Sequence, residues 1–122
     1  MSKNLLIVDD HEPTRGIIRS LLETRADLHI CGEARNGLEA IEKARDLKPD
    51  LILLDLVMPK LNGAVAASIL KKMLPKISIV LFTMYEGTAN TLARAVEADL
   101  VLAKPDGIHA LVDAVEKVLE PR

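Results

Sequence analysis

The sequence predicts an α/β fold in which five parallel strands form a central sheet with helices on both faces. Strand-like and helix-like segments alternate five times along the 122 residues. The strand-like segments are short and almost wholly apolar, without alternation of polar and apolar residues. This pattern is typical of strands that are covered on both faces. Helices of the observed length between such strands are typical of the crossovers that make neighbouring strands parallel.

The apolar runs give the expected strands, which are residues 4–8, 29–34, 51–54, 77–82 and 99–102. Segments with apolar residues at helical spacing give the expected helices, which are residues 12–24, 37–47, 63–74, 87–97 and 107–119. No repeat, low-complexity stretch or linker interrupts this order.

Capping residues and apolar stripes support individual helices. Pro13 suits the opening turn of the first helix, whose apolar stripe would be Ile17, Ile18, Leu21 and Leu22. Asn36 is the expected cap of the second helix, whose inner face would be Leu38, Ile41, Ala44 and Leu47. Asp106 would cap the last helix, in which the apolar residues are Ile108, Leu111, Val112, Val115 and Leu119.

Size and composition indicate a single domain, residues 1–122, without an attached effector domain. The single cysteine, Cys31, excludes an intramolecular disulfide and fits a reducing cytoplasm. No apolar run approaches the roughly 18 residues of a membrane span. The net charge of −2 and the scarcity of aromatic residues argue against direct binding of nucleic acid by this domain.

Polar residues follow four of the apolar runs at the points where these runs end. Asp9 and Asp10 follow the first run, Asp55 the third, Thr83 the fourth and Lys104 the fifth. Because the carboxyl ends of parallel strands share one edge of a sheet, these side chains are expected to converge in one shallow pocket. Open α/β sheets place their ligand sites beyond that edge.

This pocket predicts a magnesium site. Three carboxylates at close range repel one another unless a cation lies between them, and Mg²⁺ prefers carboxylate oxygens and water. Mn²⁺ is the alternative ion, whereas the His and Cys ligands that favour zinc are lacking. Lys104 would add a second positive charge that can contact phosphate oxygens, and Thr83 would add a hydroxyl donor. A carboxylate placed beside a cation and a lysine can act as a nucleophile toward phosphorus.

Several motifs, taken together, resemble the receiver (CheY-like) domain of bacterial two-component response regulators, of the NarL/LuxR type. The resemblance covers essentially the whole chain and depends on the order and separation of the motifs, which are Val8-Asp9-Asp10, Leu54-Asp55-Leu56-Val57-Met58-Pro59, Gly63, Phe82-Thr83-Met84 and Lys104-Pro105. It implies a flavodoxin-like (βα)5 three-layer sandwich with strand order 2-1-3-4-5.

The resemblance also implies a role for each residue of the pocket. Asp55 would be the phosphoacceptor. Asp10 would bind Mg²⁺ directly, Asp9 through water or a more distant contact, and Val57 through its backbone carbonyl. Thr83 and Lys104 would contact the phosphoryl oxygens.

The implied function is that of a signalling domain rather than an enzyme, with self-catalysed phosphotransfer and autodephosphorylation. A sensor histidine kinase or a histidine phosphotransfer protein would supply the phosphoryl group, and the switched surface would bind an unidentified downstream protein. We expect a cytoplasmic monomer or weak homodimer that does not bind membranes.

Departures from the family pattern leave an alternative open. Receivers commonly carry Tyr or Phe where this chain has Val101, and a small residue where it has Met84. The alternative is a receiver-like protein-binding module that works without phosphorylation. A haloacid-dehalogenase-like phosphohydrolase is disfavoured because its second acid would stand at Val57, and a flavodoxin-like FMN site because the first turn is acidic.

Overall fold

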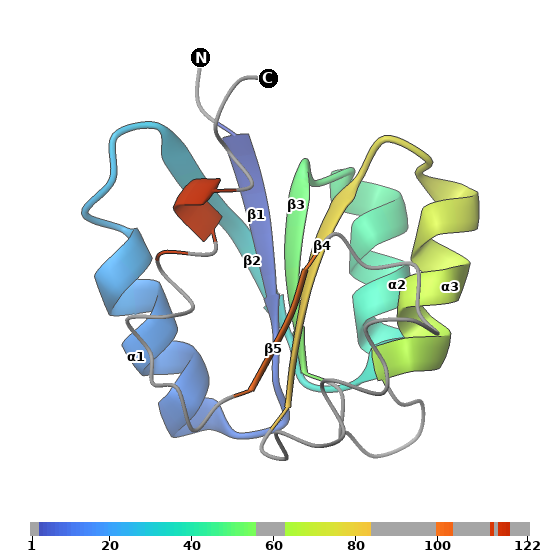
Figure 1. The fold of residues 1–122 in the computed structure, drawn as a ribbon, viewed down its shortest axis with the longest axis horizontal. Helices are drawn as coiled ribbons and strands as arrows, with labels where there is room; N and C mark the ends of the chain where they lie inside the picture. The colour runs from blue at the N-terminus through green and yellow to red at the C-terminus, as the bar shows by residue number, and fades with distance from the viewer. Residues whose placement is uncertain (1–2, 56–62, 84–99, 104–112, 114, 118–122) are drawn as a thin grey trace.

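A sheet of five parallel strands forms the centre of the molecule, as the sequence predicts (Figure 1). The structure, a computed structural model, describes residues 3–55, 63–83, 100–103, 113 and 115–117. The strands follow one another across the sheet in the order β2-β1-β3-β4-β5, which confirms the expected order. Their bounds are β1 Lys3–Val8, β2 Leu28–Ala34, β3 Leu51–Asp55, β4 Ser78–Thr83 and β5 Leu100–Ala103.

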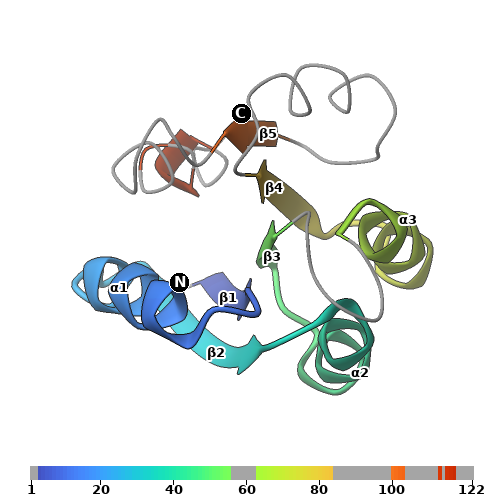
Figure 2. The ribbon, with the colours of Figure 1, turned by 90° about the horizontal axis from the view of Figure 1, so that it is seen from below.

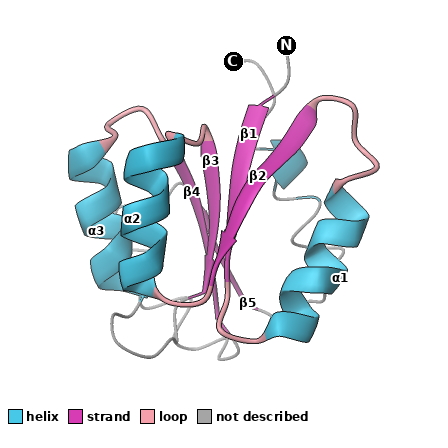
Figure 3. Cartoon of the chain, turned by 180° about the vertical axis from the view of Figure 1, so that it is seen from behind, coloured by secondary structure: helices cyan, strands magenta, loops and turns pink. Residues whose placement is uncertain are grey.

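Helices cover both faces of the sheet and give a three-layer arrangement (Figure 2). Their bounds are α1 Glu12–Leu22, α2 Gly37–Leu47 and α3 Gly63–Met73. α1 covers one face together with helical residues 113 and 115–117, and α2 and α3 lie side by side on the other face (Figure 3). Two expected helices cannot be compared in full. The helix expected at 87–97 lies outside the described residues, as do Asp106, the expected cap of the last helix, and most of that helix at 107–119.

Two apolar cores, one on each face of the sheet, explain why polar and apolar residues do not alternate along the strands. Successive residues of a strand point to opposite faces, so both sets must be apolar when both faces are covered. The core beneath α2 and α3 includes Leu6, Val8, Ile52, Leu54, Ile79 and Leu81. The core beneath α1 and Val115 includes Leu5, Ile7, Leu51, Leu53, Val80 and Phe82.

In α1 the buried stripe differs from the expected one. Ile18 and Leu22 are buried as predicted, but Ile17 is 51% exposed. The third buried residue is Arg15, which lies three positions before Ile18 and therefore on the same face of the helix. The prediction was wrong at Ile17 because the buried face of α1 runs through Arg15, Ile18 and Leu22, which leaves Ile17 on the exposed side of the helix.

In α2 the expected inner face is also partly wrong. Ala44 is buried and Ile41 is partly buried, as predicted, but Leu38 and Leu47 are 50% and 41% exposed. Gly37 and Ala40 are buried instead. Small side chains are therefore buried on this helix, which contacts α3 in its own layer and β2 and β1 in the sheet. Small residues at a contact allow two elements to approach closely, so the larger leucines lie at the margins of the contact.

Both ends of α2 have clear local causes. The side chain of Asn36 accepts a hydrogen bond from the backbone N–H of Glu39 at 2.9 Å, as its expected role as a cap requires. At the other end, Lys48 adopts a left-handed conformation with φ 49°, and its N–H donates to the carbonyl of Ala44 at 2.8 Å. Glycine is the residue that usually ends a helix in this conformation.

Among the described residues, no helix has the length and the apolar character that crossing a bilayer requires.

Candidate functional site

Three aspartates converge at the carboxyl edge of the sheet. Asp9 and Asp10 follow the last residue of β1, and Asp55 is the last residue of β3. β1 and β3 are paired with Val8 opposite Leu54, so the next residues, Asp9 and Asp55, are neighbours. One carboxylate oxygen from each of the three aspartates lies within 4.8 Å of the others. The predicted convergence of the carboxylates is therefore confirmed.

The three carboxylates differ in their exposure to solvent. Asp9 is completely buried and Asp55 is 4% exposed, whereas Asp10 is exposed. Buried carboxylates are held ionised only by hydrogen bonds or by positive charge. The cluster therefore has two inner acids, fixed by the ends of the strands, and one outer acid that solvent can reach.

The turn after β1 is closed by its own side chain. Oδ1 of Asp9 accepts a hydrogen bond from the backbone N–H of His11 at 2.9 Å, which is the local turn that aspartate characteristically forms. His11 is the N-cap of α1, and its carbonyl accepts the N–H of Arg15 at 3.1 Å. The acidic pair thus lies in a short, hydrogen-bonded connection between strand and helix.

The donor set suits a hard divalent cation. The cluster offers carboxylate oxygens only, which is the preference of Mg²⁺ and Mn²⁺, and the exposed Asp10 leaves room for water ligands. A site of this kind usually keeps several waters and binds through one or two carboxylates. The residues present therefore fit magnesium, as the sequence predicts.

The other expected members of the site are described only in part. Thr83 is the last residue of β4 and is paired with Ala103 of β5, but its hydroxyl is outside the described part of the structure. Lys104 directly follows Ala103, yet Lys104 and Val57 both lie outside the described residues. The backbone register places Thr83 and Ala103 at the same edge of the sheet as Asp55. The roles of the Thr83, Lys104 and Val57 groups stay predictions.

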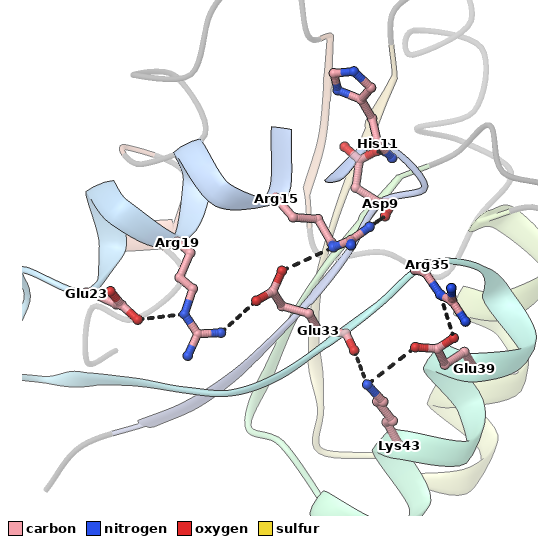
Figure 4. Close-up of polar contacts among 9 residues, drawn as sticks. All are labelled: Asp9, His11, Arg15, Arg19, Glu23, Glu33, Arg35, Glu39 and Lys43. Carbon is pink, nitrogen blue, oxygen red and sulfur yellow. Dashed lines mark hydrogen bonds and ion pairs between the residues drawn. The ribbon is translucent and has the colours of Figure 1, made fainter. Parts of the chain in front are cut away.

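Sequence reasoning missed a buried arginine beside the site (Figure 4). Arg15 is 8% exposed, and its Nη1 donates to the backbone carbonyl of Asp9 at 2.6 Å. Its Nε donates to Glu33 of β2 at 3.1 Å. The signal that was available is periodicity, because Arg15, Ile18 and Leu22 recur at the spacing of one helix face.

Glu33 joins this arginine to a larger set of ion pairs (Figure 4). Its second carboxylate oxygen accepts from Arg19 at 2.7 Å, and its backbone carbonyl accepts from Lys43 of α2. A hollow of about 400 Å³ lies along these groups and is lined by Glu12, Arg15, Gly16, Glu33, Arg35, Glu39 and Lys43. Charges of both signs line it, so it shows no preference for one charge of ligand.

Glu39 on α2 illustrates the balance of forces in this set. Partial desolvation raises the pKa of its carboxyl, but hydrogen bonds and charge from Lys43 and Arg35 outweigh it and hold that pKa below its ordinary value. The Lys43 ammonium lies 3.3 Å from Glu39. The carboxylate form of Glu39 is therefore the one that the fold stabilises.

Comparison with known protein families and curated sequences gives one consistent result. Residues 5–116 match the response regulator receiver domain family. The response regulator protein VraR of Staphylococcus saprophyticus is 40% identical over 119 residues, which cover 96% of this chain and 56% of the relative. VraR of Staphylococcus aureus gives the same identity and coverage. The chain thus spans little more than half the length of these relatives.

Solved structures agree in fold and family. The response regulator domain of Thermotoga maritima CheB has a TM-score of 0.85 and 30% identity, covering 99% of this chain and 100% of that one. A LuxR-family two-component response regulator from Aurantimonas sp. has a TM-score of 0.88 and 30% identity, covering 98% of this chain and 86% of that one.

Proposed function

Because the chain belongs to the response regulator receiver domain family, we propose that it accepts a phosphoryl group on Asp55 in a reaction that requires Mg²⁺. The observation that carries this proposal is the convergence of the carboxylate oxygens of Asp9, Asp10 and Asp55 within 4.8 Å of one another. Three like charges at this distance repel, and a divalent cation among them would turn that repulsion into attraction.

Asp10 and Asp55 would hold the cation directly, with Asp9 acting through water or a longer contact. The exposure of Asp10 and the burial of Asp9 support this division. The backbone carbonyl of Val57 would complete the protein ligands. When bound, the cation would neutralise the negative charge that gathers on the phosphoryl oxygens.

The transfer exchanges one bond to phosphorus for another. A carboxylate oxygen of Asp55 forms a bond to the phosphorus atom as the bond between phosphorus and a histidine nitrogen of the donor breaks. The nitrogen keeps that electron pair, and because the other ring nitrogen of the phosphohistidine carries a proton, the donor histidine leaves as neutral imidazole. Positioning and charge neutralisation supply most of the catalysis in such reactions. Because β3 fixes the buried Asp55 at its last residue, little reorganisation of the acceptor is needed.

Lys104 and Thr83 would stabilise the product. The Lys104 ammonium would contact one phosphoryl oxygen as a point charge, and the Thr83 hydroxyl would donate to another. The pairing of Thr83 with Ala103 supports this arrangement, since it brings the two segments to the edge where Asp55 lies. Water attack on the acyl phosphate would return the domain to its starting state.

The partners follow from this chemistry. A sensor histidine kinase or a histidine phosphotransfer protein would donate the phosphoryl group in the cytoplasm, and a downstream protein or domain would bind the altered surface. The match covers 56% of the length of VraR. In a protein of that length, the output would depend on the part that lies outside the receiver domain. The phosphoryl group shifts the population of conformations by contacting them unequally.

Intact mass spectrometry tests this proposal. The protein is incubated with phosphoramidate, with and without Mg²⁺, beside the variant Asp55→Asn. We expect one added phosphoryl group in the wild type with Mg²⁺, and none in Asp55→Asn. Asp46→Asn is the matched control, because Asp46 is an exposed acid of α2 outside the cluster, and it should be phosphorylated like the wild type.

A phosphoryl group that persists in Asp55→Asn, or that forms equally without Mg²⁺, would overturn the proposal. The absence of any adduct with phosphoramidate and with histidine-phosphorylated kinase would also overturn it. That last result would favour a receiver-like module that binds its partner without phosphorylation.

A further inference from the structure

The turn that carries the acidic pair is held by a ring of three hydrogen bonds. Oδ1 of Asp9 accepts from the N–H of His11 at 2.9 Å. The carbonyl of His11 accepts from the N–H of Arg15 at 3.1 Å. The guanidinium of Arg15 returns to the carbonyl of Asp9 at 2.6 Å. Asp10 lies within this ring, so the direction of its carboxylate depends on the same three bonds.

Arg15 makes the one bond of the ring that does not come from turn or helix geometry. The other two are the usual bonds of an aspartate turn and of the first turn of a helix. A charged donor at 2.6 Å is shorter and stronger than a neutral one. Without it, the carbonyl of Asp9 would lose its hydrogen bond to the Arg15 side chain, and the turn would be held less firmly at the end of β1.

Glu33 fixes Arg15 in the direction that this contact needs. The guanidinium of a residue that is 8% exposed requires a partner, and Oε1 of Glu33 supplies it at 3.1 Å. Lys43 in turn contacts the backbone carbonyl of Glu33, and the N–H of Asp9 donates to the next residue of β2, Ala34, at 3.1 Å. Asp9 is thus fixed from α1, through Arg15 (Figure 4), and from β2, through the carbonyl of Ala34.

We propose that Arg15, oriented by Glu33, is a positioning residue for the cation site: it anchors the Asp9 carbonyl and thereby presents the carboxylates of Asp9 and Asp10 to Mg²⁺. The inference rests on the proposed function, because it concerns the same cation. Groups that orient metal ligands without touching the metal typically change metal affinity by about 10–100-fold when they are replaced.

Calorimetric titration with Mg²⁺, repeated with Mn²⁺, tests the inference on the full chain. We expect Arg15→Met to weaken the binding of either ion by about 10–100-fold. Glu33→Gln, which keeps Arg15 but removes the charge that orients it, should weaken binding in the same direction by a smaller factor. Arg19→Met is the matched control, because Arg19 pairs with the same Glu33 at 2.7 Å, whereas the contact with the Asp9 carbonyl is made by Arg15. The affinity of the Arg19→Met variant for Mg²⁺ should stay within about twofold of the wild-type value.

A kinetic measurement separates positioning from general damage. The initial rate of phosphorylation by phosphoramidate is measured against Mg²⁺ concentration. In Arg15→Met the Mg²⁺ concentration at half-maximal rate should rise by the same factor as the dissociation constant, and the rate at saturating Mg²⁺ should approach that of the wild type. A merely structural defect would lower the saturating rate instead, which would overturn the inference.

The remaining outcomes are distinguishable. If the wild type binds Mg²⁺ and a folded Arg15→Met binds it equally well, the inference fails and the proposed function stands. If the wild type binds neither ion, both fail. If Arg15→Met does not fold, Glu33→Gln decides: unchanged affinity overturns the inference, and weakened affinity beside an unchanged Arg19→Met supports it.

Discussion

The carboxylate of Asp9 lies 2.9 Å from the backbone nitrogen of His11 and, at the same time, within 4.8 Å of the carboxylates of Asp10 and Asp55. One side chain therefore has a structural task and an electrostatic one. The hydrogen bond needs an oxygen acceptor, whereas attraction of a cation needs the negative charge.

Two substitutions at Asp9 should separate these tasks. Asp9→Asn keeps an oxygen that accepts the His11 N–H, so the free energy of unfolding without Mg²⁺ should stay at or above the wild-type value while Mg²⁺ binds more weakly. Asp9→Ala also removes the acceptor, so its free energy of unfolding should be about 1 kcal/mol lower than that of Asp9→Asn. Urea denaturation with and without Mg²⁺ measures both effects. Equal stability of the two variants would show that the turn does not depend on this bond.

Magnesium should stabilise the folded protein by binding to it in preference to the unfolded chain. At a concentration 100 times the dissociation constant, the expected gain is about 2.7 kcal/mol. Asp55→Asn, which removes one of three neighbouring charges, should unfold at a higher temperature than the wild type without Mg²⁺ and gain less when Mg²⁺ is added. Thermal unfolding at ionic strength matched with KCl measures this, and an equal Mg²⁺ shift in both proteins would contradict it.

Lys48 should be a site where glycine increases stability. Its φ of 49° places a side chain in the left-handed region, which costs an L-residue about 1 kcal/mol or more. Lys48→Gly should therefore raise the free energy of unfolding by about 0.5–1 kcal/mol, after the added entropy of the unfolded chain is subtracted. Lys48→Ala keeps a Cβ and should give no such gain. A gain that is equal in both variants would assign the effect to loss of the lysine charge.

Cys31 should react slowly with thiol reagents in the folded protein. Burial raises the pKa of its thiol above the ordinary value, and Sγ donates to the carbonyl of Leu5 at 3.3 Å. Because the folded protein favours the neutral thiol, the stability that comes from this preference is complete below pH 9.0, the ordinary pKa of a cysteine thiol. It is lost as the pH rises further. Reaction with a disulfide reagent at pH 8 should accelerate strongly in urea. Equal rates in native and denatured protein would contradict this.

The arrangement of strands and the acidic cluster were predictable because each follows from a strong local pattern. An apolar run that ends in aspartate leaves few choices for β1 and β3, and parallel pairing then brings Asp9 and Asp55 together. What could not be predicted depends on how a helix is rotated on the sheet. In α2, Gly37 and Ala40 are buried while Leu38 is half exposed, since close packing in this layer selects for small size as well as for apolar character.

The burial of Arg15 was equally hard to predict from the sequence. A charged residue in a helix is expected to face water, and this expectation outweighs the helical spacing that places Arg15 on the same face as Ile18 and Leu22. The reason for the burial lies in two groups that are distant along the chain from one another, the carbonyl of Asp9 and the carboxylate of Glu33. Tertiary structure brings these acceptors to one place, and together they compensate the cost of removing the guanidinium from water.

The most direct test of the central claim is to locate the phosphoryl group on the chain. Borohydride reduces an aspartyl phosphate to homoserine, which peptide mass spectrometry can assign to a single position. After incubation with phosphoramidate, we expect homoserine at position 55 when Mg²⁺ is present and none when Mg²⁺ is removed by chelation. Homoserine at position 9 or 10 instead, or at position 55 to the same extent without Mg²⁺, would contradict it.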